Sequence, residues 1–329
     1  MSTSELAPVG ASSAATPELH LGFDVGGTKI FGVTTDGDGA LLTSIRESTP
    51  EGARALVETL AEMVSRLAAG CDVASVGVGM AGLIGNDGCV TISPNVTGVE
   101  GADIGEQLAQ RLGMPVILDN EVNCAARWEL AFGAARGILH GLMVAVGTGI
   151  GGALILDGEV LRGAAGLAGE PGHMVVEANG RVCNCGRRGC WEMYASGSAL
   201  DRLAQERLGA AERGPSATAA ARQGNAAASD VLVEFAWWLA LGISNLCMLT
   251  DPELVVIGGG LSTDWDLLAD PVGDALAQML IGRSTATRPR VLASEAGELS
   301  AALGAALGGA LSARETQSVS ETQTPRVSQ

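Results

Sequence analysis

Positive charge is scarce in this sequence. Twenty Lys and Arg residues stand against 37 Asp and Glu residues, which leaves a net charge of −17 at pH 7. Binding to nucleic acid by counterion release needs a basic surface, so this balance argues against a nucleic-acid partner. A nucleotide ligand stays compatible with it, because backbone N–H groups and Mg²⁺ can hold phosphate locally within an acidic protein.

Long apolar runs and a secretory leader are also lacking. No run approaches the roughly 20 apolar residues that span a bilayer, and residues 1–18 have neither a basic start nor an apolar stretch. We therefore expect no membrane association and a disordered arm at 1–18. Seven cysteines, an odd number without a disulfide-like framework, indicate a reducing, cytoplasmic location.

Aromatic residues make up only 3% of the chain, whereas 47 residues are Gly, which predicts many tight turns and an aliphatic core. The 329 residues suffice for two domains. The polar residues 315–329 are expected to be a disordered tail. Strand patterns alternate with helix patterns, which predicts an α/β fold. The expected strands are 20–24, 30–34, 40–45, 73–80, 116–118, 142–146, 153–156 and 253–257, and the expected helices are 50–69, 101–112, 122–132, 195–208, 229–250 and 297–314.

Two segments share one order of strand, glycine turn, strand and Asp-Gly turn. Gly26 precedes Asp36 by ten residues, and Gly147 precedes Asp157 by ten residues. This repeat suggests a duplicated fold with a cleft between two lobes. The segment 147–152 also matches the dinucleotide fingerprint G-x-G-x-x-G, but that site needs a helix directly after the glycines. Here the chain continues as a strand and a turn, which removes the structural context for a dehydrogenase.

Two short motifs carry groups suited to phosphate and sugar chemistry. In the turn 24–29, glycines let backbone amides approach a phosphate, and Asp24 can hold Mg²⁺ through water. An ordinary glycine hairpin with a capping Asp fits the same residues. The segment 119–123 follows a strand and opens a helix. Its acids could be simple caps, although two acids and two amides also suit a sugar-binding site with a base.

The most specific pattern is a block of His and Cys residues. His173, Cys183, Cys185 and Cys190 fall within eighteen residues, and four N and S donors are what a structural zinc site requires. Reduced cysteines in a glycine-rich loop are the alternative interpretation. Glu170 and Glu192 flank the block, so a metal would hold both carboxylates rigidly enough to bind a polyol.

Together these motifs resemble the ROK family of repressors and sugar kinases, within the hexokinase and actin-like superfamily, and look most like its ATP-dependent bacterial glucokinases. The resemblance covers nearly all of 19–314. It implies a duplicated, ribonuclease H-like fold with two lobes and an interlobe cleft. The small lobe would be 19–122 plus 298–314, and the large lobe would be 123–297 with the zinc loop 173–190. The matching residues are D-V-G-G-T-K at 24–29, L-D-N-E-V-N at 118–123, V-G-T-G-I-G-G at 146–152, G-E-P-G-H at 169–173, C-N-C-G-R-R-G-C-W-E at 183–192 and V-V-I-G-G-G-L-S at 255–262.

The resemblance implies phosphoryl transfer from MgATP to the 6-hydroxyl of an aldohexose, with glucose expected first. N-acetylmannosamine, N-acetylglucosamine or fructose are alternative substrates, polyphosphate is a less favoured donor, and a non-catalytic sugar sensor is an alternative function. A homodimer or homotetramer is expected. By the same resemblance, the phosphates would be held by Gly26, Gly27, Thr28, Lys29, Gly147, Thr148 and Gly149, the adenosine by Gly258, Gly259 and Gly260, and the sugar by Asn95, Asn120, Glu170, His173 and Glu192.

The expected catalytic base departs from the family pattern. Most family kinases have Asp directly after the Asn of the 118–123 motif, whereas this chain has Glu121. Its carboxylate reaches one methylene further, and a misplacement of about 1 Å can reduce the rate on the order of 100-fold. Glu also occurs here in sugar-responsive regulators of the family. We predict Glu121 as the base, with Asp119 as an alternative that should point the other way if the strand pattern persists.

Overall fold

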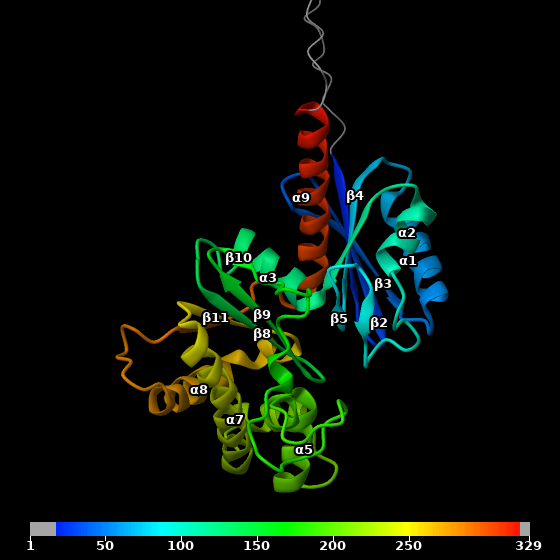
Figure 1. Cartoon of the computed structure of the whole chain (residues 1–329). Helices are drawn as coiled ribbons and strands as arrows, with labels where there is room; N and C mark the ends of the chain where they lie inside the picture. The colour runs from blue at the N-terminus through cyan, green and yellow to red at the C-terminus, as the bar shows by residue number, and fades with distance from the viewer. Residues whose placement is uncertain (1–17, 323–329) are drawn as a thin grey trace, which may run out of the picture.

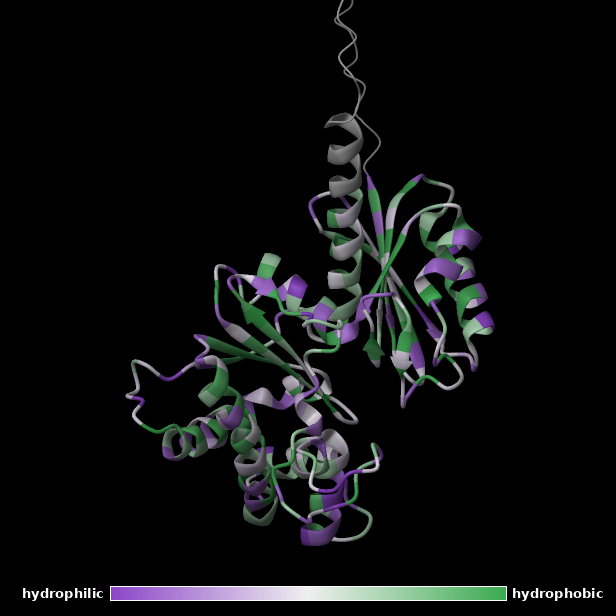
Figure 2. Cartoon of the chain, in the orientation of Figure 1, coloured by the Kyte–Doolittle hydropathy of each residue, from purple (hydrophilic) through white to green (hydrophobic). Residues whose placement is uncertain are grey.

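The computed structural model describes the backbone of residues 18–322 and the side chains of residues 18–313. Two lobes, each built on one five-stranded sheet, are joined by helices that run between them (Figure 1). The strands of both sheets are mostly hydrophobic, while the helices turn hydrophilic residues outward (Figure 2). The disordered arm expected at 1–18 and the end of the expected tail, 323–329, lie outside the described residues except for Glu18.

The first sheet has the strand order β3-β2-β1-β4-β7. β1 pairs antiparallel with β2 and β2 with β3, whereas β4 and β7 run parallel to β1. The helices α1 and α2 pack on one face, and the long helix α9 packs on the other. The strands are β1 Leu19–Val25, β2 Lys29–Thr35, β3 Leu41–Ser48, β4 Val73–Met80 and β7 Val116–Asn120, with α1 Ala53–Ala68, α2 Ile104–Leu112 and a small hairpin of β5 Leu83–Ile84 and β6 Val90–Ile92.

The second sheet repeats this topology with the order β10-β9-β8-β11-β12. Its first three strands are antiparallel, and β11 and β12 run parallel to β8. The repeat confirms the predicted duplicated α/β fold. The strands are β8 Gly141–Val146, β9 Ile150–Leu156, β10 Glu159–Val160, β11 Leu254–Gly258 and β12 Arg290–Ala293.

Helices build the core of the second lobe around Trp191, Phe235 and Leu239. Among the described residues, one helix, α7, is both long enough and apolar enough to cross a membrane. However, 61% of its most apolar window is buried inside this lobe. It is placed as a core helix. The helices are α4 Glu192–Ala195, α5 Gly197–Leu208, α6 Gly214–Arg222, α7 Ala226–Thr250 and α8 Trp265–Met279, with 3₁₀ turns η1 Pro171–His173, η2 Gly260–Asp264 and η3 Gly297–Leu299.

Two helices form the joint between the lobes. α3, Glu121–Ala131, follows β7 of the first sheet and packs Val122 and Ala125 on the second sheet. α9, Ser300–Thr322, follows the second sheet and packs on the first. The two helices cross where Gly304 meets the carbonyl group of Cys124, and any side chain at Gly304 would overlap that group. The close crossing places Glu121 at the joint.

Three expectations about the elements need correction. β9 begins at Ile150, so the turn is 147–149 and not 147–152. Gly151 and Gly152 belong to the strand, where the lack of a side chain leaves room for Val122 and Pro171. α9 continues to Thr322, beyond the expected end at 314, since no Gly or Pro interrupts 315–322. Finally, α8 and β12 have no counterpart among the expected elements, because Pro271 and Gly273 interrupt the helical pattern of α8.

Candidate active site

The carboxyl ends of three neighbouring strands bring the first acidic residues together. Asp24 on β1 is paired with Gly79 on β4, and Gly79 is paired with Asp119 on β7. A Cβ atom at Gly79 would lie 3.3 Å from the Cα atom of Glu121. Because Gly79 has no side chain, the chain that follows β7 can pass close to β4. Asp24 and Glu121 therefore lie at the same edge of the sheet.

Asn120 caps α3 and orients Glu121. The Asn120 Oδ1 atom accepts hydrogen bonds from the backbone N–H groups of Val122 at 2.7 Å and Asn123 at 3.2 Å, as an N-cap does. Its Nδ2 atom donates to Glu121 Oε2 at 3.0 Å and to the carbonyl of Gly82 at 3.0 Å. A predicted sugar-binding residue and the predicted base are thus joined by one hydrogen bond.

Two carboxyl groups of this edge, those of Glu121 and Asp24, have raised pKa values. Burial raises the pKa of Glu121 well above its ordinary value, and the negative charges of Asp24 and Glu170 raise it further. Burial also raises the pKa of Asp24 to about 7, with Lys29 acting in the opposite direction and Glu298 in the same one. Glu170 belongs to the second lobe, so a carboxylate of that lobe lies near enough to raise the pKa of Glu121.

Glu170 and Glu192 complete this acidic group from the second lobe. Burial raises the pKa of Glu170, His173 lowers it, and Glu192 raises it. The His173 ring lies between the two carboxylates, with Nε2 4.0 Å from Glu170 Oε2 and Nδ1 3.5 Å from Glu192 Oε1. The predicted sugar ligands of this lobe are therefore adjacent.

The four predicted metal ligands also come together. The ligand atoms of His173, Cys183, Cys185 and Cys190 all lie within 4.8 Å of one another, with 3.6 Å between the sulfur atoms of Cys185 and Cys190. Donor atoms around a tetrahedral zinc ion, at about 2.3 Å from it, are about 3.8 Å apart. The donor set and its spacing therefore fit zinc. Burial acts to raise the pKa of Cys185, yet hydrogen bonds from Arg187 lower it to about 6, which favours the thiolate that a metal binds.

The predicted metal ligands contact the predicted sugar ligands directly. The Cys183 thiol donates to Glu192 Oε1 at 2.9 Å, and Cys183 Sγ lies 3.8 Å from His173 Nδ1. His173 thus directs Nδ1 to the cluster and Nε2 toward Glu170. A ligand whose second nitrogen is held by another group has a fixed ring orientation.

The first glycine turn lies beside the predicted sugar residue Asn95. The Gly26 N–H group donates to the Lys29 carbonyl at 3.1 Å, and the Thr49 hydroxyl donates to the Gly26 carbonyl at 2.6 Å. A Cβ atom at Gly27 would lie 2.5 Å from the Asn95 carbonyl oxygen. Gly27 and Thr28 are exposed, so their backbone can be approached by a ligand.

The second glycine turn lies against the sugar residues of its own lobe. The Gly147 N–H group donates to the Gly149 carbonyl at 3.0 Å, and a Cβ atom at Gly149 would lie 2.5 Å from Glu192 Oε2. Thr148 is exposed. A Cβ atom at Gly259 would lie 2.5 Å from the Val146 carbonyl, so the predicted adenosine turn 258–260 adjoins the predicted phosphate turn.

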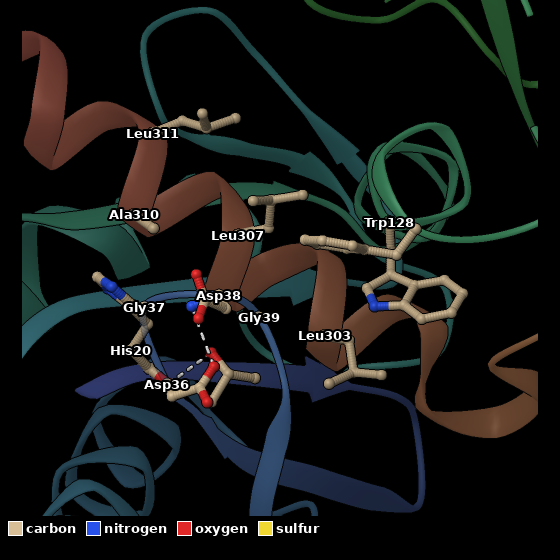
Figure 3. A pocket seen from close by; sticks show the side chains of 12 residues that line it. His20, Asp36, Gly37, Asp38, Gly39, Trp128, Leu303, Leu307, Ala310 and Leu311 are labelled. Atoms are coloured by element: carbon tan, nitrogen blue, oxygen red, sulfur yellow. Dashed lines mark hydrogen bonds between the residues drawn. The ribbon is translucent and has the colours of Figure 1, made fainter. Parts of the chain in front are cut away.

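Two cavities occur in the described part of the chain. One, of about 90 Å³, lies between Trp128 of α3, Leu303 and Leu307 of α9, and the turn 36–39 (Figure 3). No predicted site residue lines it. The other, of about 210 Å³, is lined by Glu170 and otherwise mostly by apolar residues. The predicted polar site residues other than Glu170 therefore lie outside both cavities.

Sequence reasoning missed the arginines around Asp119. Arg127 Nη2 lies 2.8 Å from Asp119 Oδ2, and Arg162 Nη2 lies 3.6 Å from Asp119 Oδ1. This buried carboxylate forms ion pairs with two guanidinium groups, which argues against Asp119 as an alternative base. The spacing of Arg127 from Asp119 could have suggested the first contact, but no sequence signal places Arg162 here.

Comparisons with known proteins agree with this geometry. The sequence profile of the ROK family matches residues 20–308. A glucokinase of Streptomyces coelicolor is 34% identical over 306 residues, covering 88% of this chain and 96% of that protein. An N-acetylgalactosamine kinase, AgaK, of Shewanella sp. is 34% identical over 299 residues, covering 88% and 96%. The crystal structure of a ROK family glucokinase from Streptomyces griseus in complex with glucose and AMPPNP matches with a TM-score of 0.80 and 34% identity, over 88% of this chain and 99% of that chain.

Proposed function

This chain belongs to the ROK family, and on that basis we propose that it transfers the γ-phosphoryl group of ATP to the 6-hydroxyl of an aldohexose, with glucose as the substrate. One observation carries the proposal. The charge of Glu170 from the second lobe raises the pKa of Glu121 at the joint, while the glycine turn of the first lobe borders Asn95 and that of the second lobe borders Glu192.

Glu121 is the base of the proposed reaction. It accepts the proton of the 6-hydroxyl while that oxygen bonds to the γ-phosphorus, and the bond from the γ-phosphorus to the leaving oxygen of ADP breaks. A raised pKa suits this role, because a base whose pKa lies closer to the working pH holds the transferred proton better. Asn120 directs the carboxylate through its hydrogen bond to Oε2, and positioning is the larger part of phosphoryl transfer.

The nucleotide is held by the two glycine turns. Gly26, Gly27, Thr28 and Lys29 present N–H groups and side-chain donors from one lobe, and 147–149 presents the same kind of groups from the other. The turn 258–260 supports the adenosine. Mg²⁺ neutralises phosphate charge when bound, and Asp24 is placed to hold its water ligands. A bound cation would keep Asp24 ionised despite the raised pKa.

The sugar is held by five residues, and zinc fixes the position of His173 among them. Zinc bound by His173, Cys183, Cys185 and Cys190 has a structural role, because all four positions are filled by protein donors. It fixes the ring of His173, which lies between the carboxylates of Glu170 and Glu192. The proposed sugar ligands are Asn95, Asn120, Glu170, His173 and Glu192.

A panel of sugars tests this function. Coupled ADP release is measured with glucose, mannose, fructose and the N-acetyl derivatives of glucosamine, mannosamine and galactosamine. We expect the highest kcat/KM with glucose. The similarity to AgaK, at the same identity as the glucokinase, makes an N-acetylhexosamine kinase the second candidate, and a higher kcat/KM with those sugars would establish it. If none of these sugars supports ADP release, the non-catalytic sugar sensor would be the remaining candidate.

The remaining proposals concern the whole protein. We propose a small lobe of 19–122 plus 298–314, a large lobe of 123–297, a homodimer or homotetramer, and a cytoplasmic location without nucleic-acid partners. Light scattering coupled to size exclusion tests the oligomeric state directly, and a monomer at micromolar concentration would contradict it.

A further inference from the structure

Asp119 is the anchor of the junction between β7 and α3. Its side chain is 2% exposed. The Oδ1 atom accepts hydrogen bonds from the Asn120 N–H group at 2.8 Å and from Asn123 Nδ2 at 3.2 Å. The Oδ2 atom accepts from Arg127 Nη2 at 2.8 Å. These contacts join the end of the strand to the first turns of the helix that carries Glu121.

Arg162 reaches this anchor from the other lobe. It follows β10 in the second sheet, and its Nη2 atom lies 3.6 Å from Asp119 Oδ1, which is too long for a hydrogen bond. Within the described part of the chain, the buried Arg162 Nε and the buried Asn123 Oδ1 have no hydrogen-bond partner. A buried donor or acceptor without a partner destabilises the folded state. The two residues beside Asp119 Oδ1 thus each have a buried polar atom without a partner: Nε of Arg162 and Oδ1 of Asn123.

The segment that carries Arg162 connects the sugar site to the first lobe. We call residues 161–168 the crossing segment, because it leads from β10 to Glu170 and touches the small hairpin of the first lobe. Asn86 Nδ2 donates to the Ala164 carbonyl at 3.0 Å, and the Asn86 N–H group donates to the Ala165 carbonyl at 3.1 Å. A displacement of Glu170 on sugar binding would be transmitted along this segment to Arg162.

We propose that Arg162 is a positioning residue for phosphoryl transfer. In the substrate-bound state its guanidinium group closes on Asp119 and donates from Nε to Asn123 Oδ1. This fixes the start of α3, and the Asn120 amide then directs the Glu121 carboxylate at the sugar hydroxyl. The inference rests on the proposed function, because the role of Glu121 as base belongs to it.

Removing the guanidinium group tests the inference. For Arg162→Ala we expect kcat with glucose and ATP to fall on the order of 100-fold, the loss that a misplacement of about 1 Å causes. The dissociation constant for glucose, measured without ATP by tryptophan fluorescence, should stay within about twofold. Arg162→Lys should recover only part of kcat, because an ammonium group lacks the planar fork of donors.

Chemical rescue separates positioning from a general loss of structure. Millimolar methylguanidinium should restore part of kcat in Arg162→Ala and leave the wild-type protein unchanged. Arg207→Ala is the matched control, because it removes a surface ion pair with Glu234 in the same lobe. It should keep the wild-type kcat. In Asn123→Ala, which removes the proposed acceptor, the additional effect of Arg162→Ala on kcat should be smaller than in the wild-type background.

The outcomes distinguish this inference from the proposed function. A kcat within twofold of wild type in Arg162→Ala would overturn the inference, as would a loss that methylguanidinium does not restore. A parallel loss of glucose binding would also overturn it, because that result indicates a structural role. Wild-type protein that releases no ADP with any sugar, or Glu121→Gln protein with normal turnover, would instead overturn the proposed function.

Discussion

The Nδ1 atom of His173 lies 3.8 Å from the Sγ atom of Cys183, and this contact joins the predicted metal ligands to the proposed sugar site. The opposite nitrogen of the ring lies 4.0 Å from Glu170. The imidazole therefore contacts Cys183 through one nitrogen and faces Glu170 with the other. A metal bound at Nδ1 would fix the direction of Nε2. Groups that orient a ligand in this way typically change metal affinity or activity 10–100-fold when removed.

The first prediction concerns zinc. We expect one zinc ion per chain when the protein is purified without chelator, measured by inductively coupled plasma mass spectrometry. Cys183→Ser should lose most of the zinc and bind glucose about 10–100-fold more weakly, because the His173 ring between Glu170 and Glu192 loses its fixed orientation. Cys71→Ser, which changes an exposed cysteine outside the cluster, is the control. Normal glucose affinity in Cys183→Ser would refute the coupling.

The second prediction concerns the packing behind Glu192. Trp191 is fully buried and donates from Nε1 to the Trp238 carbonyl at 2.8 Å, and a side chain at Gly242 would overlap its indole. Gly242→Ala should lower the free energy of unfolding by about 1–3 kcal/mol and weaken glucose binding. Gly273→Ala on α8, where nothing lies within 4 Å, should instead be neutral or stabilising by up to about 1 kcal/mol. Equal stabilities of the two variants in urea unfolding would contradict this.

The third prediction concerns the pH dependence of activity. Burial and the charges of Asp24 and Glu170 raise the pKa of Glu121, and the base works only when deprotonated. The kcat/KM for glucose should therefore keep rising with pH above the range in which an ordinary carboxylate has lost its proton. Glu170→Gln removes one of the charges, so the rising limb should move to lower pH. If kcat/KM of Glu170→Gln rises over the same pH range as that of the wild type, the ionisation of Glu121 does not control this rise.

The fourth prediction concerns the pH dependence of stability. The pKa of Asp24 is about 7 in the folded protein and 3.8 ordinarily, so between these values the folded state binds more protons than the unfolded state. Stability then falls as pH rises through this window. Asp24→Asn cannot ionise and should raise Tm relative to wild type more at pH 8 than at pH 4.5, without ATP or Mg²⁺. An equal change in Tm at both values would contradict the shift.

Much of the fold was predictable because its signals are local. The spacing from Gly26 to Asp36 and from Gly147 to Asp157 reflects two copies of one strand order, and the structure repeats that order in both sheets. The grouping of the predicted metal ligands was predictable for the same reason, since Cys183, Cys185 and Cys190 lie within one short loop.

The remaining features depend on contacts between distant segments. The approach of Arg162 to Asp119 exists only because the crossing segment passes from one lobe to the other. Similarly, Gly304 is needed where α9 crosses α3, and a glycine within an Ala-rich helix gives no sign of which helix it meets. α8 was not expected, because Pro271 lies inside it and proline usually ends a helix.

The most direct test is the turnover of Glu121→Gln beside that of Glu121→Asp. Glutamine keeps the size of the side chain and can still pair with Asn120, but it cannot accept the hydroxyl proton. We predict that Glu121→Gln loses glucose-dependent ADP release while still binding glucose, and that Glu121→Asp keeps measurable turnover. Wild-type turnover in Glu121→Gln would contradict the account.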